Sequence, residues 1–203
     1  MNEQHQQAYL NLIQRLLNCG SSDEIQEILA ANQDLIDAGL LQAMEAVAQI
    51  AAQEGDENKA NWLRNLATAL ARYLYEPFLR EVLQATYESR GDAQVVDPLL
   101  AANTDKLNFI FADVLYDWAT TTLEEMQPDE AQSLAAVIVI SLFSDLIQQF
   151  PLGDKASNME IAITGYEIAL TVYTREAFPQ DWAMTQNNLG IAYGDRILGD
   201  RAE

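Results

Sequence analysis

Cysteine and histidine are almost absent from this chain. Among its 203 residues, Cys19 is the one cysteine and His5 the one histidine. A lone cysteine cannot form an internal disulfide, and a zinc site needs several ligands of these two types. On one continuous helix the two residues would stand ~21 Å apart, too far for a nucleophile and its base. We expect no metal, no cofactor, a solvated His5 and a buried Cys19.

Basic residues are also scarce. The chain has 11 lysines and arginines against 31 acidic residues, a net charge of −20. Such a charge repels the phosphates of nucleic acids and of anionic lipids, so we expect neither nucleic acid nor membrane as a partner. The charge can serve solubility alone, or it can attract a basic segment of a partner protein, and both interpretations remain open.

Long apolar runs and secretion signals are missing as well. The longest largely apolar run, residues 134–143, has ten residues including Ser141, about half of the ~20 that a membrane-spanning helix needs. The first residues, MNEQHQQ, lack the basic and apolar blocks of a signal peptide. We therefore expect a cytoplasmic protein.

Glycine and proline, which end helices, number only 9 and 5. Pro77 is expected to end one helix and begin the next, and Ser157 and Asp181 to cap the last two. The run AVIVI at 136–140 has the propensity of a strand, but no second run could pair with it, so we expect a buried helix there. The fold class is therefore all-α, with about ten helices over residues 3–19, 21–31, 34–54, 58–76, 77–91, 93–102, 104–126, 128–149, 157–176 and 181–198.

Two internal repeats are visible. LAANQD at residues 29–34 recurs as LAANTD at 100–105, an offset of 71. This pair predicts a duplicated multi-helix unit whose second copy runs to about residue 149. LGDKA at 152–156 recurs as LGDRA at 198–202, an offset of 46. The offset of 46 lies within the range of about 20–50 residues that is typical of stacked repeat architectures.

The C-terminal third resembles a tetratricopeptide (TPR) repeat protein. Its last expected helix carries Leu189-Gly190 and Tyr193, with Gln186 where the repeat has tryptophan, and the helix before carries Ala162, Tyr166 and Ala169. The small residues of this pattern, Gly190 among them, let helix axes approach closely. The long period and the stretches 173–179 and 182–193 resemble kinesin-light-chain-like TPR repeats of bacterial proteins in which a caspase-like CHAT domain often follows. This chain holds no CHAT domain, so its Cys/His dyad is carried over to no residue.

The resemblance implies a TPR-like α-solenoid of antiparallel helix pairs. Residues 1–129 would be a helical leader region containing the duplicated unit, and residues 130–203 would be degenerate, truncated TPR repeats. It also implies a protein-protein interaction scaffold, the recognition region of a larger regulatory protein, that binds a peptide or protein partner and is not an enzyme. Two alternatives stay open: a structural self-assembly module, and an enzyme using carboxylates in a helical pocket.

The candidate binding residues lie on the last expected helix. Leu189, Gly190 and Tyr193 belong to its expected packing face. Met184, Asn187, Asn188 and Ile191 are then expected to turn toward the concave TPR surface. An asparagine amide both donates and accepts hydrogen bonds, which suits a peptide backbone, and in kinesin-light-chain-type repeats a similar asparagine faces bound peptide. The competing interpretation is that these amides bond neighbouring helices within the stack.

The end of the chain suggests a third kind of contact. LGDRA at 198–202 corresponds to the turn after which, one repeat earlier, another helix begins. Because no such helix follows here, we expect an apolar stripe of Leu189, Tyr193 and Ile197 to stay uncovered by the chain itself. Uncovered apolar stripes associate with other surfaces, so this end is a candidate for self-association.

Overall fold

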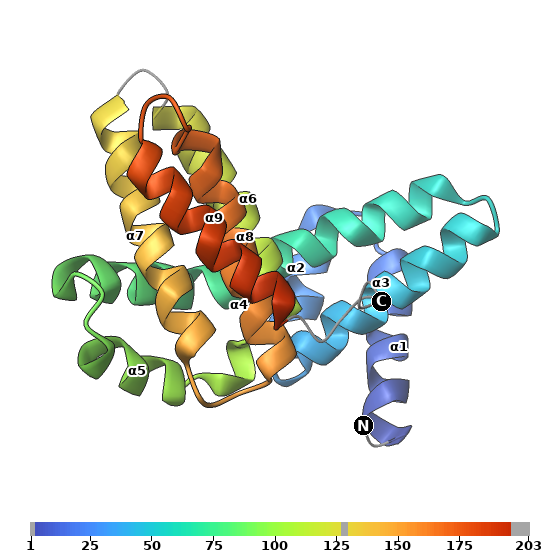
Figure 1. The fold of residues 1–203 in the computed structure, drawn as a ribbon. Helices are drawn as coiled ribbons and strands as arrows, with labels where there is room; N and C mark the ends of the chain where they lie inside the picture. Colours follow the sequence, from blue (N-terminus) through green and yellow to red (C-terminus); the bar gives the residue numbers. More distant parts are fainter. Residues whose placement is uncertain (1–2, 127–129, 196–203) are drawn as a thin grey trace. The chain divides into compact units, whose positions relative to one another are not determined.

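The chain is all-α in a computed structural model, as its composition predicts. The structure describes residues 3–126 and 130–195, and within them it has nine α-helices, two short 3₁₀ helices and no strand. Figure 1 labels the α-helices in chain order. Their bounds are α1 Glu3–Leu17, α2 Ser22–Ala30, η1 Gln33–Leu35, α3 Ala38–Gln53, α4 Glu57–Ser89, α5 Ala93–Ala101, η2 Thr104–Lys106, α6 Phe109–Met126, α7 Glu130–Gln149, α8 Lys155–Val172 and α9 Pro179–Gly194.

The expected break at Pro77 is wrong, because α4 continues through it. Proline lacks an N–H, so the carbonyl of Tyr73 loses its partner in the helix. Tyr73 and Pro77 both lie on the exposed side of the helix, where water can bond that carbonyl. Tyr75 and Phe78, on the other side, are buried and hold the helix on the core. Packing of the apolar face thus outweighs the local break.

The starts of the last two helices also differ from the expectation. The N-cap of α8 is Asp154, whose carboxylate accepts bonds from the backbone N–H and the hydroxyl of Ser157, at 2.8 and 2.7 Å. These bonds lower the pKa of Asp154. Helix α9 begins at Pro179, so Asp181 lies in its first turn and does not cap it. Both corrections shift a start by about two residues, the usual error of sequence-based boundaries. Residues 136–140 are helical as expected, but they are not buried throughout, since Ile138 is 44% exposed.

The chain divides into two compact units, Met1–Leu74 and Tyr75–Glu203. The division falls inside α4. The boundary expected between residues 129 and 130 lies at the edge of a segment outside the described residues, so the division into leader and repeats stays a prediction.

Helix bounds recur along the chain at the offset of 71. Helices α2 and α5, η1 and η2, and the starts of α3 and α6 are related by this number of residues. Asn32 and Asn103 precede the two 3₁₀ helices with nearly the same backbone angles, φ −132° and ψ 36° or 33°. Each donates its side-chain amide to the carbonyl four residues earlier. We call residues 3–74 copy 1 and residues 75–149 copy 2.

A tyrosine on the first helix of each copy contacts the residue that begins the third. Tyr9 donates its hydroxyl to the carboxylate of Asp37, the N-cap of α3, at 2.8 and 2.9 Å. In copy 2 the amide of Asn108 donates to the Tyr75 hydroxyl at 2.9 Å, while its oxygen accepts from the N–H of Phe111. The same device therefore fixes the third helix of each copy.

We predict that replacing Tyr9 changes how the free energy of unfolding depends on pH. Burial, the Asp37 bond and the Asp37 charge raise the pKa of Tyr9 to about 12. Between pH 10 and 12 the folded state then keeps a proton that the unfolded state loses, so stability falls as pH rises through this range. Tyr9→Phe should lower the free energy of unfolding by about 2 kcal/mol at neutral pH. Above pH 10, the stability of this variant should decline less steeply than that of wild type. Urea unfolding followed by circular dichroism measures both, and an unchanged slope would contradict the assignment.

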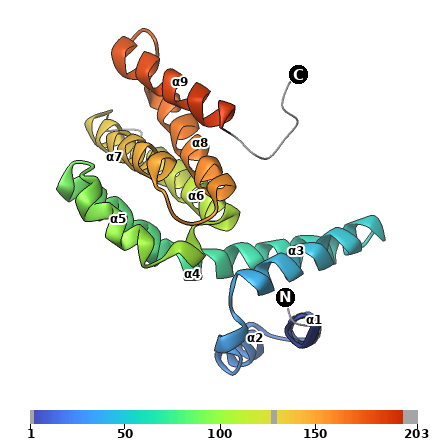
Figure 2. The ribbon, with the colours of Figure 1, turned by 60° about the horizontal axis from the view of Figure 1, so that its bottom comes forward.

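Helices α6 to α9 form the core of the second unit. Helix α8 packs against α6, α7 and α9, and Figure 2 shows α8 between α7 and α9. Gly165 of α8 lies so close to α7 that an added β-carbon would stand 2.0 Å from the Ser144 hydroxyl oxygen. The expected close approach at Gly190 is wrong, because a β-carbon there meets nothing within 4 Å.

Helix α7 is long and apolar enough to cross a membrane, the one such helix among the residues that the structure describes. Its stretch Ala131–Gln149 has a mean hydropathy of 1.6, and 28% of that stretch is buried. Val137, Ile140, Phe143 and Ile147 are at most 1% exposed and form one side of the helix. Helix α7 packs against α6 and α8.

Candidate protein-binding surface

Three of the four expected binding residues form an exposed stripe on α9. Met184 is 59% exposed and Ile191 51% exposed, and Asn187 between them is also exposed. Positions i, i+3 and i+7 lie on one side of a helix, so the two apolar side chains flank the amide. The opposite side of α9 is buried through Thr185, Leu189 and Ala192. We call Met184, Asn187 and Ile191 the α9 stripe.

Asn188 lies outside this stripe. Its amide donates to Asp145 of α7 at 2.8 Å, and its own carbonyl accepts from the amide of Gln148 at 3.5 Å. Consecutive residues of an α-helix point about 100° apart, so Asn187 and Asn188 cannot share one role. For Asn188 the structure shows the bonding within the stack that was the competing interpretation.

Asp145 joins three helices through side chains. Besides Asn188 of α9, it accepts from the hydroxyl of Tyr166 of α8 at 2.7 Å, and Gln148 Oε1 lies 2.6 Å from the same hydroxyl. Tyr166 is 1% exposed. Burial and the neighbouring Asp145 raise its pKa far above the ordinary value for tyrosine. The network fixes how α9 rests on α7 and α8, and thereby which of its residues face solvent.

Sequence reasoning did not identify Asp145. One signal could have found it: it is the only charged residue in the long apolar stretch 131–150. A carboxylate at such a place is costly to bury without partners, which predicts donors on neighbouring helices. The identity of the donors, Tyr166 and Asn188, depends on how the helices cross and cannot be read from spacing.

The residues expected on the packing face of α9 also divide into buried and exposed ones. Leu189 is buried, whereas Tyr193 is 43% exposed and donates its hydroxyl to Glu167 of α8. Gly190 is exposed. Ile197, the last member of the expected uncovered stripe, lies outside the described residues, as does the second copy of the LGDKA repeat.

His5 and Cys19, the two residues considered for catalysis or zinc binding, have different surroundings. His5 is exposed and its ring contacts Tyr9, with ring centres 5.8 Å apart. Cys19 is half-buried and not buried as expected, because it lies two residues beyond the end of α1, where its thiol donates to the Arg15 carbonyl. Partial burial and the nearby Glu24 raise the pKa of that thiol. Over residues 3–126 and 130–195, no group of three or more His, Cys, Asp or Glu side chains is placed to hold a metal ion.

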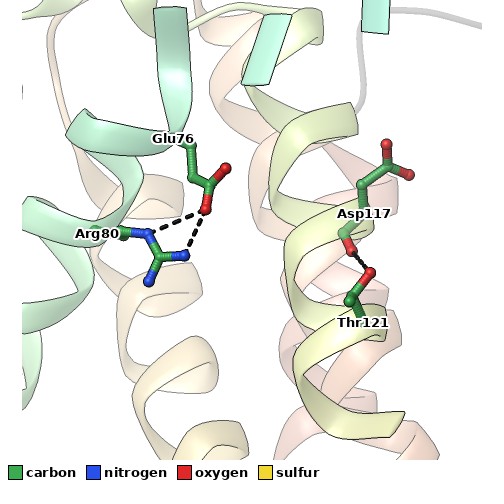
Figure 3. Close-up of polar contacts among 4 residues, drawn as sticks. All are labelled: Glu76, Arg80, Asp117 and Thr121. Atoms are coloured by element: carbon green, nitrogen blue, oxygen red, sulfur yellow. Dashed lines mark hydrogen bonds and ion pairs between the residues drawn. The ribbon is translucent and has the colours of Figure 1, made fainter. Parts of the chain in front are cut away.

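Figure 3 shows two polar contacts of the second unit that stay within single helices. Arg80 donates to Glu76 one turn earlier on α4, at 3.0 and 2.5 Å. The Thr121 hydroxyl donates to the backbone carbonyl of Asp117 at 2.8 Å. Such contacts between residues i and i+4 support the exposed faces of helices. They therefore account for these side chains without a ligand.

Comparison of the chain with models of known protein families, with curated proteins and with solved structures finds no match.

Proposed function

We propose that this chain is a protein-interaction scaffold that binds a peptide or protein segment through the α9 stripe. The observation that carries the proposal is the exposure of Met184 and Ile191 on either side of Asn187, on a helix whose other side is fixed to α7 and α8. Exposed apolar side chains beside an amide give a surface both contact area and backbone recognition. A fixed helix also loses little entropy on binding.

The resemblance to kinesin-light-chain-like TPR repeats supports the same function. In such repeats a helix of this kind lines a concave surface, and the repeats belong to the recognition region of a larger cytoplasmic regulatory protein. The net charge of −20 favours a partner segment that carries basic residues and disfavours nucleic acid and anionic membranes. The stacking of α7, α8 and α9 is compatible with an α-solenoid of antiparallel helix pairs.

The adjacent asparagines provide a matched test. Peptides are selected from a displayed library on the full chain, and their affinities are then measured for two single variants. Asn187→Ala should weaken binding about tenfold and leave the free energy of unfolding within about 0.5 kcal/mol. Asn188→Ala should lower that free energy by about 1 to 2 kcal/mol, because Asp145 loses a donor.

Two results would contradict the proposal. Selected peptides that bind Asn187→Ala and wild type equally would place the binding site elsewhere. A library that yields no peptide specific for the folded chain would remove the evidence for peptide binding. Tyr116→Ala, which removes an exposed aromatic side chain from α6, is the control for general loss of apolar surface and should leave binding unchanged.

A further inference from the structure

The first unit contains a groove between α2 and α4. The groove has a volume of about 720 Å³. Ile25 and Leu29 line it from α2, and Leu66, Leu70 and Tyr73 line it from α4. Within each helix these residues follow one another at intervals of three or four, which places them on one side of that helix. Two apolar helix sides therefore form the walls of the groove.

The lining of this groove is uncharged. Among the residues that the structure describes, none that lines the groove is acidic or basic. Asp23, Glu24 and Glu27 occupy other positions of α2, so their carboxylates lie off the groove. The same holds for Arg72 on α4. The spacing of residues along the two helices thus separates the charges of this region from the groove.

Four uncharged polar side chains complete the lining. Ser22, Gln26 and Gln33 contribute a hydroxyl and two amides from α2 and η1, and Tyr73 contributes a hydroxyl from α4. Gln26 is exposed and Tyr73 is 71% exposed, so both lie at the rim. These groups donate and accept hydrogen bonds without carrying a charge. Apolar walls with a few such groups are the usual composition of a small-molecule site.

The size of the groove favours a small molecule over a protein. Its volume of about 720 Å³ falls within the range of about 300 to 1,000 Å³ that is typical of ligand pockets. Twelve of the described residues line it, whereas a stable protein interface takes about 20 to 30 residues from each partner. A protein partner would therefore need contacts well beyond this groove.

Helix α2 would gain packing from such a ligand. None of its nine residues is buried, and Ile25 and Leu29 are only half-buried. A helix of this length depends on the packing of its apolar side for stability. A ligand that covers Ile25 and Leu29 supplies such packing, so ligand binding should stabilise α2 against local opening.

Electrostatics selects a neutral ligand. Residues 1–74 hold ten acidic residues and four lysines or arginines, so the unit as a whole repels anions. A carboxylate or phosphate in the groove would find no cation among the described lining residues, and an ammonium group would find no carboxylate. Placing an unpaired charge against apolar walls is costly. The lining therefore disfavours both signs of charge.

We propose that the groove between α2 and α4 binds an uncharged, mainly apolar small molecule that carries a hydroxyl or carbonyl group. The apolar part of the ligand contacts Leu29, Leu66 and Leu70. Its polar group forms hydrogen bonds with the uncharged side chains at the rim. The groove shares no residue with the α9 stripe, so each proposal can fail without the other.

Two fluorescent probes with one ring skeleton test this proposal on the full chain. N-phenylnaphthylamine is neutral, and anilinonaphthalene sulfonate adds a sulfonate to the same rings. Fluorescence titration should show saturable binding of the neutral probe and about tenfold weaker binding of the sulfonate. Leu29→Glu should weaken binding of the neutral probe about tenfold. Val95→Glu is the control, because it adds the same charge to α5 at a residue that is 51% exposed and outside the groove.

Gln26→Lys is a second variant, and it changes an exposed residue that the fold does not need buried. Because the lysine places a cation at the groove, the sulfonate probe should bind about fivefold more tightly. Glu27→Gln changes the net charge by the same amount at a residue of α2 that does not line the groove. This control should leave the affinities of both probes unchanged.

The neutral probe should also slow amide hydrogen exchange within α2. Circular dichroism confirms that each variant is folded. Three results would overturn the proposal: no saturable binding of the neutral probe, equal binding of both probes to wild type, or a folded Leu29→Glu that binds the neutral probe as wild type does. Failure of Gln26→Lys to strengthen binding of the sulfonate probe would place the probes elsewhere and would overturn it as well.

Discussion

Gly165→Ala is expected to lower the free energy of unfolding by about 3 kcal/mol, because it forces α7 and α8 apart. The added β-carbon would stand 2.0 Å from Ser144 Oγ and 3.3 Å from both Ser144 Cβ and a methyl group of Ile140. Ser144 is fully buried and bonded to the Ile140 carbonyl, so it has little room to move. Urea unfolding monitored by circular dichroism measures the loss.

Gly190→Ala is the matched control for this prediction. Gly190 is an exposed glycine inside α9 with open space around it. Alanine there should stabilise the helix by about 0.5 to 1 kcal/mol, since glycine is the poorer helix former. Ser144→Ala should restore part of the stability that Gly165→Ala loses. Equal effects of the two glycine variants would contradict the close approach of α7 and α8.

Tyr166→Ala should have an effect of similar size, about 4 kcal/mol, because it removes a ring that is 1% exposed at the centre of α7, α8 and α9. Tyr166→Phe keeps the ring but removes the hydroxyl that donates a hydrogen bond to Asp145. Its expected loss is about 1 to 2 kcal/mol. The difference between the two variants separates packing from hydrogen bonding. Thermal and urea unfolding of both, with wild type, provide the measurement.

A further consequence concerns binding. If Tyr166 and Asp145 hold α9 in place, Tyr166→Phe should weaken peptide binding at the α9 stripe about as much as it loosens that helix, although residue 166 is buried and cannot contact the peptide. A variant that loses stability but keeps full affinity would show that the stripe does not depend on this network.

Local rules predicted most helix bounds. Ser21 caps α2 through the N–H of Glu24, as its capping box indicates, and the recurrence of LAAN matches the helix bounds of α2 and α5. The failure at Pro77 has a tertiary cause, because the buried side of α4 holds the helix together where the local sequence favours a break. Propensity is a weak guide wherever one side of a helix is strongly apolar.

The site was only partly predictable. Spacing correctly placed Met184, Asn187 and Ile191 on one exposed side, but it could not separate Asn188, whose position is set by a carboxylate 43 residues earlier in the chain. The glycine at which two helices approach closely could not be predicted for the same reason. Gly165 and Gly190 both lie within helices, and only the packing of a second helix distinguishes them.

Site-specific crosslinking tests the central claim most directly. A photoreactive amino acid is placed at Asn187 in the full chain, inside the cells that make it, and the adducts are identified by mass spectrometry. The control position is Gln186, which is also exposed on α9 but points about 100° away from Asn187. The scaffold account predicts a discrete adduct with one other protein from Asn187 and none from Gln186. Identical adducts from both positions, or adducts only between copies of this chain, would contradict it.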